Sequence, residues 1–172
     1  MAEARFLCQG YLSDSELALV PGIPFGTELP EKKCAVLECA QEIPCNPCQN
    51  CCPVGAISLS GADMTNLPVV DPQKCIGCGT CIAACPGMAI FVVDPAYGAD
   101  VCQVEIPYEF YPVPEVGEVV TVHGRDGSYI CDGQVSRVRS LEKFDHTVIL
   151  GFTCPREFGM KARAIRRKEE RR

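Results

Sequence analysis

The stretch Cys75-Ile-Gly-Cys-Gly-Thr-Cys-Ile-Ala-Ala-Cys85-Pro86 places four cysteines in the order C-x2-C-x2-C-x3-C-P. Three thiolates at this short, regular spacing can hold three irons of one cubane face. The fourth is expected to begin a helix with proline behind it and to reach a second cluster. Structural zinc usually takes two C-x2-C pairs far apart in the chain, so the spacing favours an iron-sulfur centre over zinc.

An upstream copy of this pattern is displaced by a constant offset of 33 residues, and the two copies share seven identities in fifteen positions. The identical residues are Ile43, Cys45, Cys48, Cys52, Pro53, Ala56 and Ile57, which recur as Ile76, Cys78, Cys81, Cys85, Pro86, Ala89 and Ile90. Asn46 falls opposite Gly79, and both residue types tolerate a positive φ. The repeat therefore predicts the same backbone turn in both copies as well as the same ligands.

The upstream copy lacks one ligand, because Glu42 stands where Cys75 stands in the other copy. Cys39, three residues earlier, can replace it if the chain loops out, which gives C-x5-C-x2-C-x3-C-P. Cys51 is the alternative, although it aligns with the small residue Ala84, and a cysteine that is not a ligand behaves as a small hydrophobic residue. The unchanged spacing from Cys48 to Cys52 favours Cys39.

The cysteine content is high throughout, with 14 cysteines in 172 residues. Such a density calls for metal sites or a disulfide framework. We find neither a cationic leader with an apolar run and a cleavage site nor a stretch approaching the ~18 apolar residues that a membrane span needs. We therefore expect a cytoplasmic protein without a membrane span, in which the cysteines act as thiolate ligands and do not form disulfides.

Charge is unevenly distributed along the chain. Residues 161–172 carry seven basic and two acidic side chains, whereas residues 1–160 carry nine basic and 20 acidic ones. The acidic body argues against a nucleic-acid partner, whose phosphates need Lys and Arg. The basic end is predicted to be a solvated helix, and the alternative is an anchor for an acidic partner. Up to Phe110 there are 13 acidic and 4 basic residues, which predicts low reduction potentials for clusters bound there.

Differences in composition and patterning along the sequence divide the chain into four segments and predict an α+β fold. Residues 1–33 are an extended N-terminal arm, with a short helix signal where Ser13 caps and Glu16 follows three residues later. Residues 34–96 form a ferredoxin-like two-cluster domain, residues 97–156 a small SH3-like β-barrel, and residues 157–172 a basic C-terminal tail. The arm is too poor in apolar residues to build a core and is expected to lie on a neighbouring domain or partner subunit.

The barrel prediction depends on short runs that alternate β-branched and polar residues. We expect strands at 119–122, 134–138 and 147–152, with turns at 123–127 and 131–133. The candidates for its interior are Val120, Val122, Val135, Val138, Ile149 and Phe152.

Five cysteines have no pairwise ligand spacing, namely Cys8, Cys34, Cys102, Cys131 and Cys154. We expect them to be buried core residues; the alternative is that some of them join a further metal site. His123 and His146 are expected at the surface. No catalytic constellation, phosphate-binding loop or dinucleotide fingerprint is present, so we assign no reaction to the chain alone.

Residues 39–93 resemble the bacterial two-[4Fe-4S] ferredoxin family. That resemblance implies one cluster on Cys39, Cys45, Cys48 and Cys85, and a second on Cys75, Cys78, Cys81 and Cys52. The whole chain, from the arm through Glu38–Cys48 to the barrel, also resembles the ferredoxin-like subunits of multi-subunit flavin-dependent amino-acid dehydrogenases, of the proline, hydroxyproline and opine types.

These resemblances imply a non-catalytic iron-sulfur subunit that carries single electrons between a flavin, FAD or FMN, in a partner dehydrogenase subunit and a further acceptor. The protein would then belong to a hetero-oligomer with flavin-containing subunits. Two alternatives stay open: a structural or redox-sensing iron-sulfur module whose barrel recognises a ligand, and a free diffusible ferredoxin.

Overall fold

A computed structural model describes residues 6–168. One seven-stranded sheet forms its centre, in the order β1-β4-β5-β8-β7-β6-β9, and all its pairings are antiparallel. Its strands are β1 (Cys34–Leu37), β4 (Ile90–Asp94), β5 (Val101–Tyr108), β6 (Val119–His123), β7 (Tyr129–Arg139), β8 (Val148–Pro155) and β9 (Ala164–Arg167). Strands β1 and β9 are the edges of the sheet.

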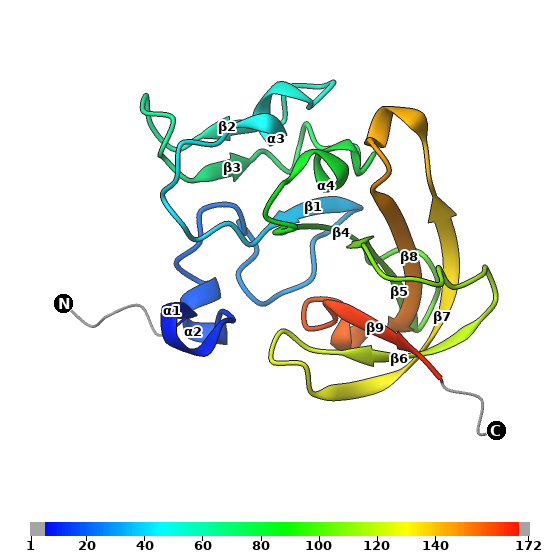
Figure 1. The fold of residues 1–172 in the computed structure, drawn as a ribbon. Helices are drawn as coiled ribbons and strands as arrows, with labels where there is room; N and C mark the ends of the chain where they lie inside the picture. The colour runs from blue at the N-terminus through cyan, green and yellow to red at the C-terminus, as the bar shows by residue number, and fades with distance from the viewer. Residues whose placement is uncertain (1–5, 169–172) are drawn as a thin grey trace.

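The remaining elements are short. A hairpin of β2 (Ile57–Leu59) and β3 (Pro68–Val70) and the helices α3 (Pro47–Asn50) and α4 (Thr80–Ala84) lie together on the side of β1 and β4 (Figure 1). The other helices are α1 (Phe6–Gln9), α2 (Asp14–Leu17) and the 3-10 turns η1 (Glu142–Phe144) and η2 (Arg156–Phe158). The motif-bearing helices are therefore grouped at one end of the sheet.

Strand β4 shows why the sheet separates two cores. Ile90 and Val92 are buried in one apolar cluster and Phe91 and Val93 in the other, because successive side chains of a strand point to opposite faces. The motif cysteines Cys48, Cys75 and Cys81 belong to the same cluster as Ile90 and Val92. One face of the sheet thus carries the cysteine motifs.

The N-terminal segment lies on the opposite face. Leu17, Val20 and Ile23 are buried in the cluster that contains Phe91 and Val93, and the carbonyl oxygen of Gly22 accepts a hydrogen bond from the Leu37 amide at 3.1 Å. Helix α2 begins after Ser13, whose amide donates to the Glu16 carboxylate at 2.9 Å. The predicted cap is confirmed, and the segment packs on the sheet of its own chain.

The strands expected at 119–122 and 134–138 lie within β6 and β7, and the one expected at 147–152 corresponds to β8, which begins one residue later, at Val148. The interior candidates Val120, Val122, Val135 and Phe152 are at most 1% exposed and share one core, against which Val138 is partly buried. Ile149 is fully buried too, but in the cluster of the motif cysteines, so its expected place in the same interior is wrong. The turn expected at 131–133 is wrong, because these residues lie inside β7. Strands β5 to β9 belong to the same sheet as β4, which pairs with β5, and a separate SH3-like barrel remains a prediction.

The helix predicted for the basic C-terminal end is also wrong for residues 164–167. They form β9, which pairs with β6 and places Ile165 opposite Val122. Ile165 is buried while Ala164, Arg166 and Arg167 are exposed. The alternation of a strand at the sheet edge therefore explains the segment, and residues 169–172 of the expected tail lie outside the described part of the chain.

Candidate metal centre

The two helices of the cysteine repeat place corresponding residues at corresponding positions. Cys48 in α3 and Cys81 in α4 are both buried. Asn46 and Gly79 are the N-cap residues of these helices, but only Gly79 has a positive φ, of 77°, whereas φ of Asn46 is −142°. The repeat therefore extends to the helices, while the prediction of a shared positive-φ turn is wrong.

Cys52 and Cys85 follow their helices and do not begin new ones, which corrects our expectation for the Cys-Pro pairs. Cys85 is the C-cap of α4, and Cys52 comes directly after the C-cap of α3. The Ala56 amide donates to the Cys52 sulfur at 3.2 Å, and the Ala89 amide donates to the Cys85 sulfur at 3.4 Å. Because Ala56 and Ala89 also correspond in the repeat, both copies offer the same N–H to sulfur contact.

The first cavity, of about 530 Å³, is lined by Cys39, Cys45 and Cys85. Burial raises the pKa of the Cys39 thiol, and the neighbouring thiols of Cys85 and Cys45 raise it further. Burial, then Cys85 and Cys39, raise the pKa of Cys48 to about 11. These four cysteines therefore share one neighbourhood, and the raised pKa values of Cys39 and Cys48 favour their protonated thiols in the absence of a bound cation.

A second, smaller cavity is lined by Cys52, Cys75, Cys78 and Cys81 among apolar residues. Burial raises the pKa of Cys81 well above its usual value, and Cys51 and then the other three cysteines of this set raise it further. The Ala35 amide donates to the Cys75 sulfur at 3.4 Å. This set is thus the counterpart of the first. The Cys75 sulfur accepts a main-chain hydrogen bond, as the sulfurs of Cys52 and Cys85 do.

Each set combines the two copies of the repeat. Cys85, from the downstream motif, lies with Cys39 and Cys45, while Cys52, from the upstream motif, lies with Cys75, Cys78 and Cys81. In two-cluster ferredoxins the fourth cysteine of each run ligates the other cluster. The spatial exchange of Cys52 and Cys85 matches that arrangement.

Cys51 lies between the two sets. Its thiol donates to the Cys48 carbonyl oxygen at 3.5 Å, and burial, then Cys52, Cys78 and Cys85, raise its pKa. It lines neither cavity, in contrast to Cys39.

Sequence reasoning missed Cys34 as a neighbour of the site. Cys34 is fully buried at the start of β1, and its hydrogen bond to Cys75 lowers the pKa of Cys75 to about 6. The same contact, together with burial, raises the pKa of Cys34. No short spacing could have revealed this, because 41 positions separate the two residues and a β-strand brings them together.

The donor set fits [4Fe-4S] clusters. Two groups of four thiols and three N–H to sulfur contacts, with an apolar lining around the second group, are features that hold such clusters and adjust their potentials. Across residues 6–168, no three Cys, His, Asp or Glu side chains are arranged to hold a single metal ion. A cubane takes one thiolate at each iron, so its ligands need not meet at one atom.

The cysteines outside the motifs are mostly buried, as expected: Cys34, Cys102 and Cys154 are buried and Cys131 is partly buried. Cys8 is exposed, which contradicts the expectation. His146 is exposed, but His123 is only 9% exposed, and its ring contacts Thr121 and the Gly127 carbonyl. The glycine turn that suggested a surface position for His123 contacts its ring, with the Gly127 carbonyl oxygen 3.0 Å from Nδ1.

Comparison with known proteins supports this site. Residues 68–91 match the family model of the 4Fe-4S binding domain. This segment is similar to a 4Fe-4S binding domain. It contains Cys75, Cys78, Cys81 and Cys85, so the family match falls on the downstream cysteine motif.

Three curated relatives extend the similarity. An uncharacterized ferredoxin of Methanocaldococcus jannaschii is 34% identical over 86 residues, which are 50% of this chain and 46% of the relative. The polyferredoxin-like subunit of an aliphatic sulfonate oxidoreductase of Pyrococcus furiosus is 47% identical over 46 residues, 27% of this chain and 25% of that subunit. A tetrathionate reductase subunit of Salmonella typhimurium is 37% identical over 60 residues, 34% of this chain and 24% of that protein.

The chain thus spans less than half of the length of each of these relatives. No solved structure matches it significantly. Over residues 6–168, no helix has the length and apolar character required to cross a bilayer.

Proposed function

We propose that this ferredoxin chain carries two [4Fe-4S] clusters and serves as the electron-transfer subunit of a hetero-oligomeric oxidoreductase. One cluster would be held by Cys39, Cys45, Cys48 and Cys85, and the other by Cys75, Cys78, Cys81 and Cys52. When bound, the clusters supply single-electron chemistry. The observation that carries the proposal is the exchange of Cys52 and Cys85 between the two cysteine sets.

The chain's own residues have a binding and tuning role in this proposal. The thiols of each set replace their protons with iron, and the amides of Ala35, Ala56 and Ala89 donate to the sulfurs of Cys75, Cys52 and Cys85. Such donors stabilise negative charge on sulfur and so favour the reduced state.

A partner subunit is supported by the relatives, two of which are named as subunits of oxidoreductases. We propose that the partner here is a flavin-containing dehydrogenase subunit of the amino-acid dehydrogenase type. A flavin exchanges one or two electrons, and a neighbouring one-electron carrier can take these electrons singly. The chain itself would oxidise no substrate.

The experiment is a two-part assay. First, the anaerobically purified chain should contain about eight irons and eight acid-labile sulfides, as two cubanes require. Second, its visible absorbance should bleach when the co-purified flavoprotein and an amino-acid substrate are added together, and should not change with the substrate alone. Four irons per chain, zinc in place of iron, or substrate oxidation by the chain alone would contradict the proposal.

A further inference from the structure

A row of directly paired residues runs across five strands from the second cysteine set to β7. Ala35 pairs with Val92, Val92 with Glu105, Glu105 with Gly151, and Gly151 with Arg137. Directly paired residues of neighbouring strands share a face of the sheet. Ala35 and Val92 line the second cavity, so Glu105 lies on the face that carries the second cysteine set.

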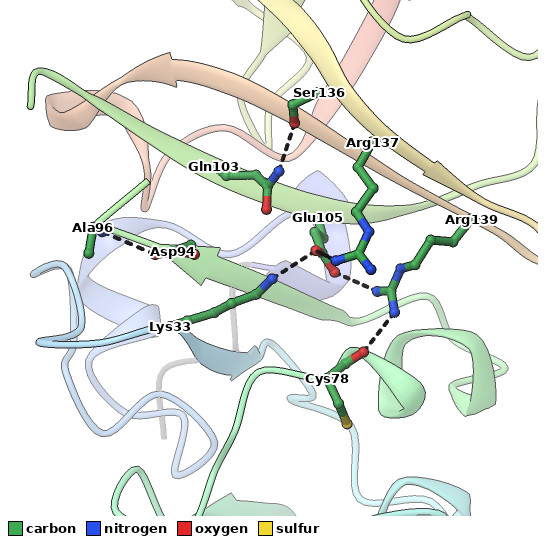
Figure 2. A network of polar contacts seen from close by, with 9 residues as sticks. All are labelled: Lys33, Cys78, Asp94, Ala96, Gln103, Glu105, Ser136, Arg137 and Arg139. Atoms are coloured by element: carbon green, nitrogen blue, oxygen red, sulfur yellow. Dashed lines mark hydrogen bonds and ion pairs between the residues drawn. The ribbon is translucent and has the colours of Figure 1, made fainter. Parts of the chain in front are cut away.

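Glu105 is a carboxylate in the middle of this sheet, only 1% exposed. Three basic side chains surround it in Figure 2: Lys33 Nζ is 2.9 Å from Oε1, Arg139 Nη2 is 2.5 Å from Oε2, and Arg137 Nη1 is 3.6 Å from Oε1. Gly151 separates Glu105 from Arg137 in the row and has no side chain to block their approach. A buried carboxylate needs such partners, but three cations exceed what one charge requires.

Two of these cations also contact the loop of the second cysteine set. Arg139 Nη1 donates to the Cys78 carbonyl oxygen at 2.8 Å (Figure 2). A Cβ on Gly79 would lie 2.4 Å from Arg139 Nη2, and a Cβ on Gly77 would lie 2.4 Å from Lys33 Cγ. The two glycines that flank Cys78 therefore leave the space in which these two basic side chains lie.

The charge balance follows from these contacts. Lys33, Arg137 and Arg139 carry three positive charges against the single negative charge of Glu105. Arg137 and Arg139 come from β7, outside the acidic first part of the chain. Cys78 thus lies near a net positive charge, whereas the part of the chain up to Phe110, which contains it, is acidic overall.

We propose that Lys33, Glu105 and Arg139 form a charge clamp on the Cys75–Cys81 loop that raises the reduction potential of the second cluster. The inference rests on the proposed presence of two clusters. Reduction adds one electron to the cluster, and nearby positive charge stabilises the more negative state. Lys33 and Arg139 are not ligands; they act on the cluster through their charge, which the contacts with Glu105 and with the loop hold in place.

The test is an EPR-monitored redox titration of the isolated holoprotein with mediators. Arg139→Gln should lower the potential of one cluster, with roughly a tenfold change in its reduction equilibrium, equivalent to ~59 mV for one electron. The other cluster should keep its potential. Lys33→Met should shift the same cluster in the same direction, Glu105→Gln should shift it in the opposite direction, and Arg139→Lys should restore most of the wild-type value.

Arg137→Gln is the matched control. It removes the same charge from the same strand, but the Arg137 side chain is 50% exposed while that of Arg139 is 14% exposed, so solvent screens it. Its shift should be clearly smaller. Equal shifts in the Arg137 and Arg139 variants, equal shifts of both clusters, or shifts of the same sign in Lys33→Met and Glu105→Gln would overturn the clamp.

A further result would overturn the charge clamp: Arg139→Gln loses one cluster while Lys33→Met leaves the potential unshifted. The network would then hold the loop in place without changing the reduction potential. The titration uses no partner subunit. A protein without two clusters would refute the proposed function, whereas two clusters with unresponsive potentials would refute only this inference.

Discussion

Arg163 donates from Nε to Oε1 of Glu38 at 2.7 Å, across 125 positions of sequence. Arg125 binds the same carboxylate, with Nε 2.9 Å from Oε2. Both arginines are nearly buried, with side-chain exposures of 4% and 10%. Because Glu38 directly precedes Cys39, the C-terminal part of the chain holds the residue beside a proposed ligand of the first cluster.

Replacing Glu38 with alanine should strongly destabilise the protein. The change leaves two buried guanidinium groups without their carboxylate, and breaking such a pair costs about 3–5 kcal/mol. Urea unfolding monitored by circular dichroism measures the loss. Glu118→Ala is the control, because the Glu118–Arg167 pair is much more exposed and such surface pairs contribute only about 0–1 kcal/mol. Equal losses in the two variants would contradict this role for Glu38.

The same carboxylate should make stability depend on acid pH. Burial raises the pKa of Glu38, but Arg163 and Arg125 outweigh it and hold the pKa below its usual value. The stabilisation is therefore complete above the unfolded pKa of ~4.3 and is lost as the pH falls through the lower folded pKa. Below about pH 4.3, the urea midpoint of the wild type should fall more steeply than that of Glu38→Gln. Parallel curves would contradict the prediction.

Cys39→Ser should lose or convert one cluster, whereas Cys51→Ala should leave both intact. Cys39 lines the first cavity with Cys45 and Cys85, while the Cys51 thiol donates to a main-chain carbonyl at the end of α3. Iron content and the EPR spectrum of the reduced protein measure the outcome. A change with Cys51→Ala and none with Cys39→Ser would require a ligand set that contains Cys51.

Gly79→Ala should reduce iron retention and stability more than Gly55→Ala. Both glycines have positive φ, which costs an alanine about 1–2 kcal/mol, but only at Gly79 does the new Cβ also meet Arg139 and Glu105. Gly87→Ala, with a Cβ in open space and no positive φ, should be nearly neutral. Thermal unfolding and iron content of the three variants test this order. Equal effects of Gly79→Ala and Gly55→Ala would show that the clash does not matter.

Cys102 and Cys154 should resist alkylation of the native holoprotein. They are paired across β5 and β8 with their sulfurs 3.6 Å apart, and they are 0% and 2% exposed. Cys8 is exposed and should react first with iodoacetamide. Mass spectrometry of peptides after a short reaction locates the label. Labelling of Cys102 or Cys154 as fast as Cys8 would show that this part of the sheet opens readily.

The parts of this protein that could be predicted are those encoded by short-range patterns. The spacing of Cys75, Cys78, Cys81 and Cys85 is local, and it carried the iron-sulfur assignment that the family match supports. The alternation in 119–122, 134–138 and 147–152 likewise predicted strands that the structure contains. In both cases neighbouring residues alone determine the pattern.

The parts that could not be predicted depend on pairing between distant residues. Ala164–Arg167 has a single buried apolar side chain, Ile165, and its basic composition suggested a helix. The segment is a strand because it pairs with β6, and the local sequence does not reveal that pairing. Glu105 and Arg139 are 34 positions apart, and only the sheet order brings them together beside Cys78. Nothing in the local sequence distinguishes Arg139 from the exposed Arg137.

Strand β4 belongs to the cysteine-bearing segment, yet it pairs with β1 on one side and with β5 on the other. A chain cut after residue 96 would leave the inner edge of β4 without its hydrogen-bond partners, and unpaired edges invite aggregation. An engineer who wished to transplant the cysteine-bearing segment onto another scaffold would have to take β5 as well, and with it β8 and β7, the strand that carries Arg139. The transferable unit therefore extends in the sheet from β1 at least to β7, well beyond the boundaries of the cysteine motifs.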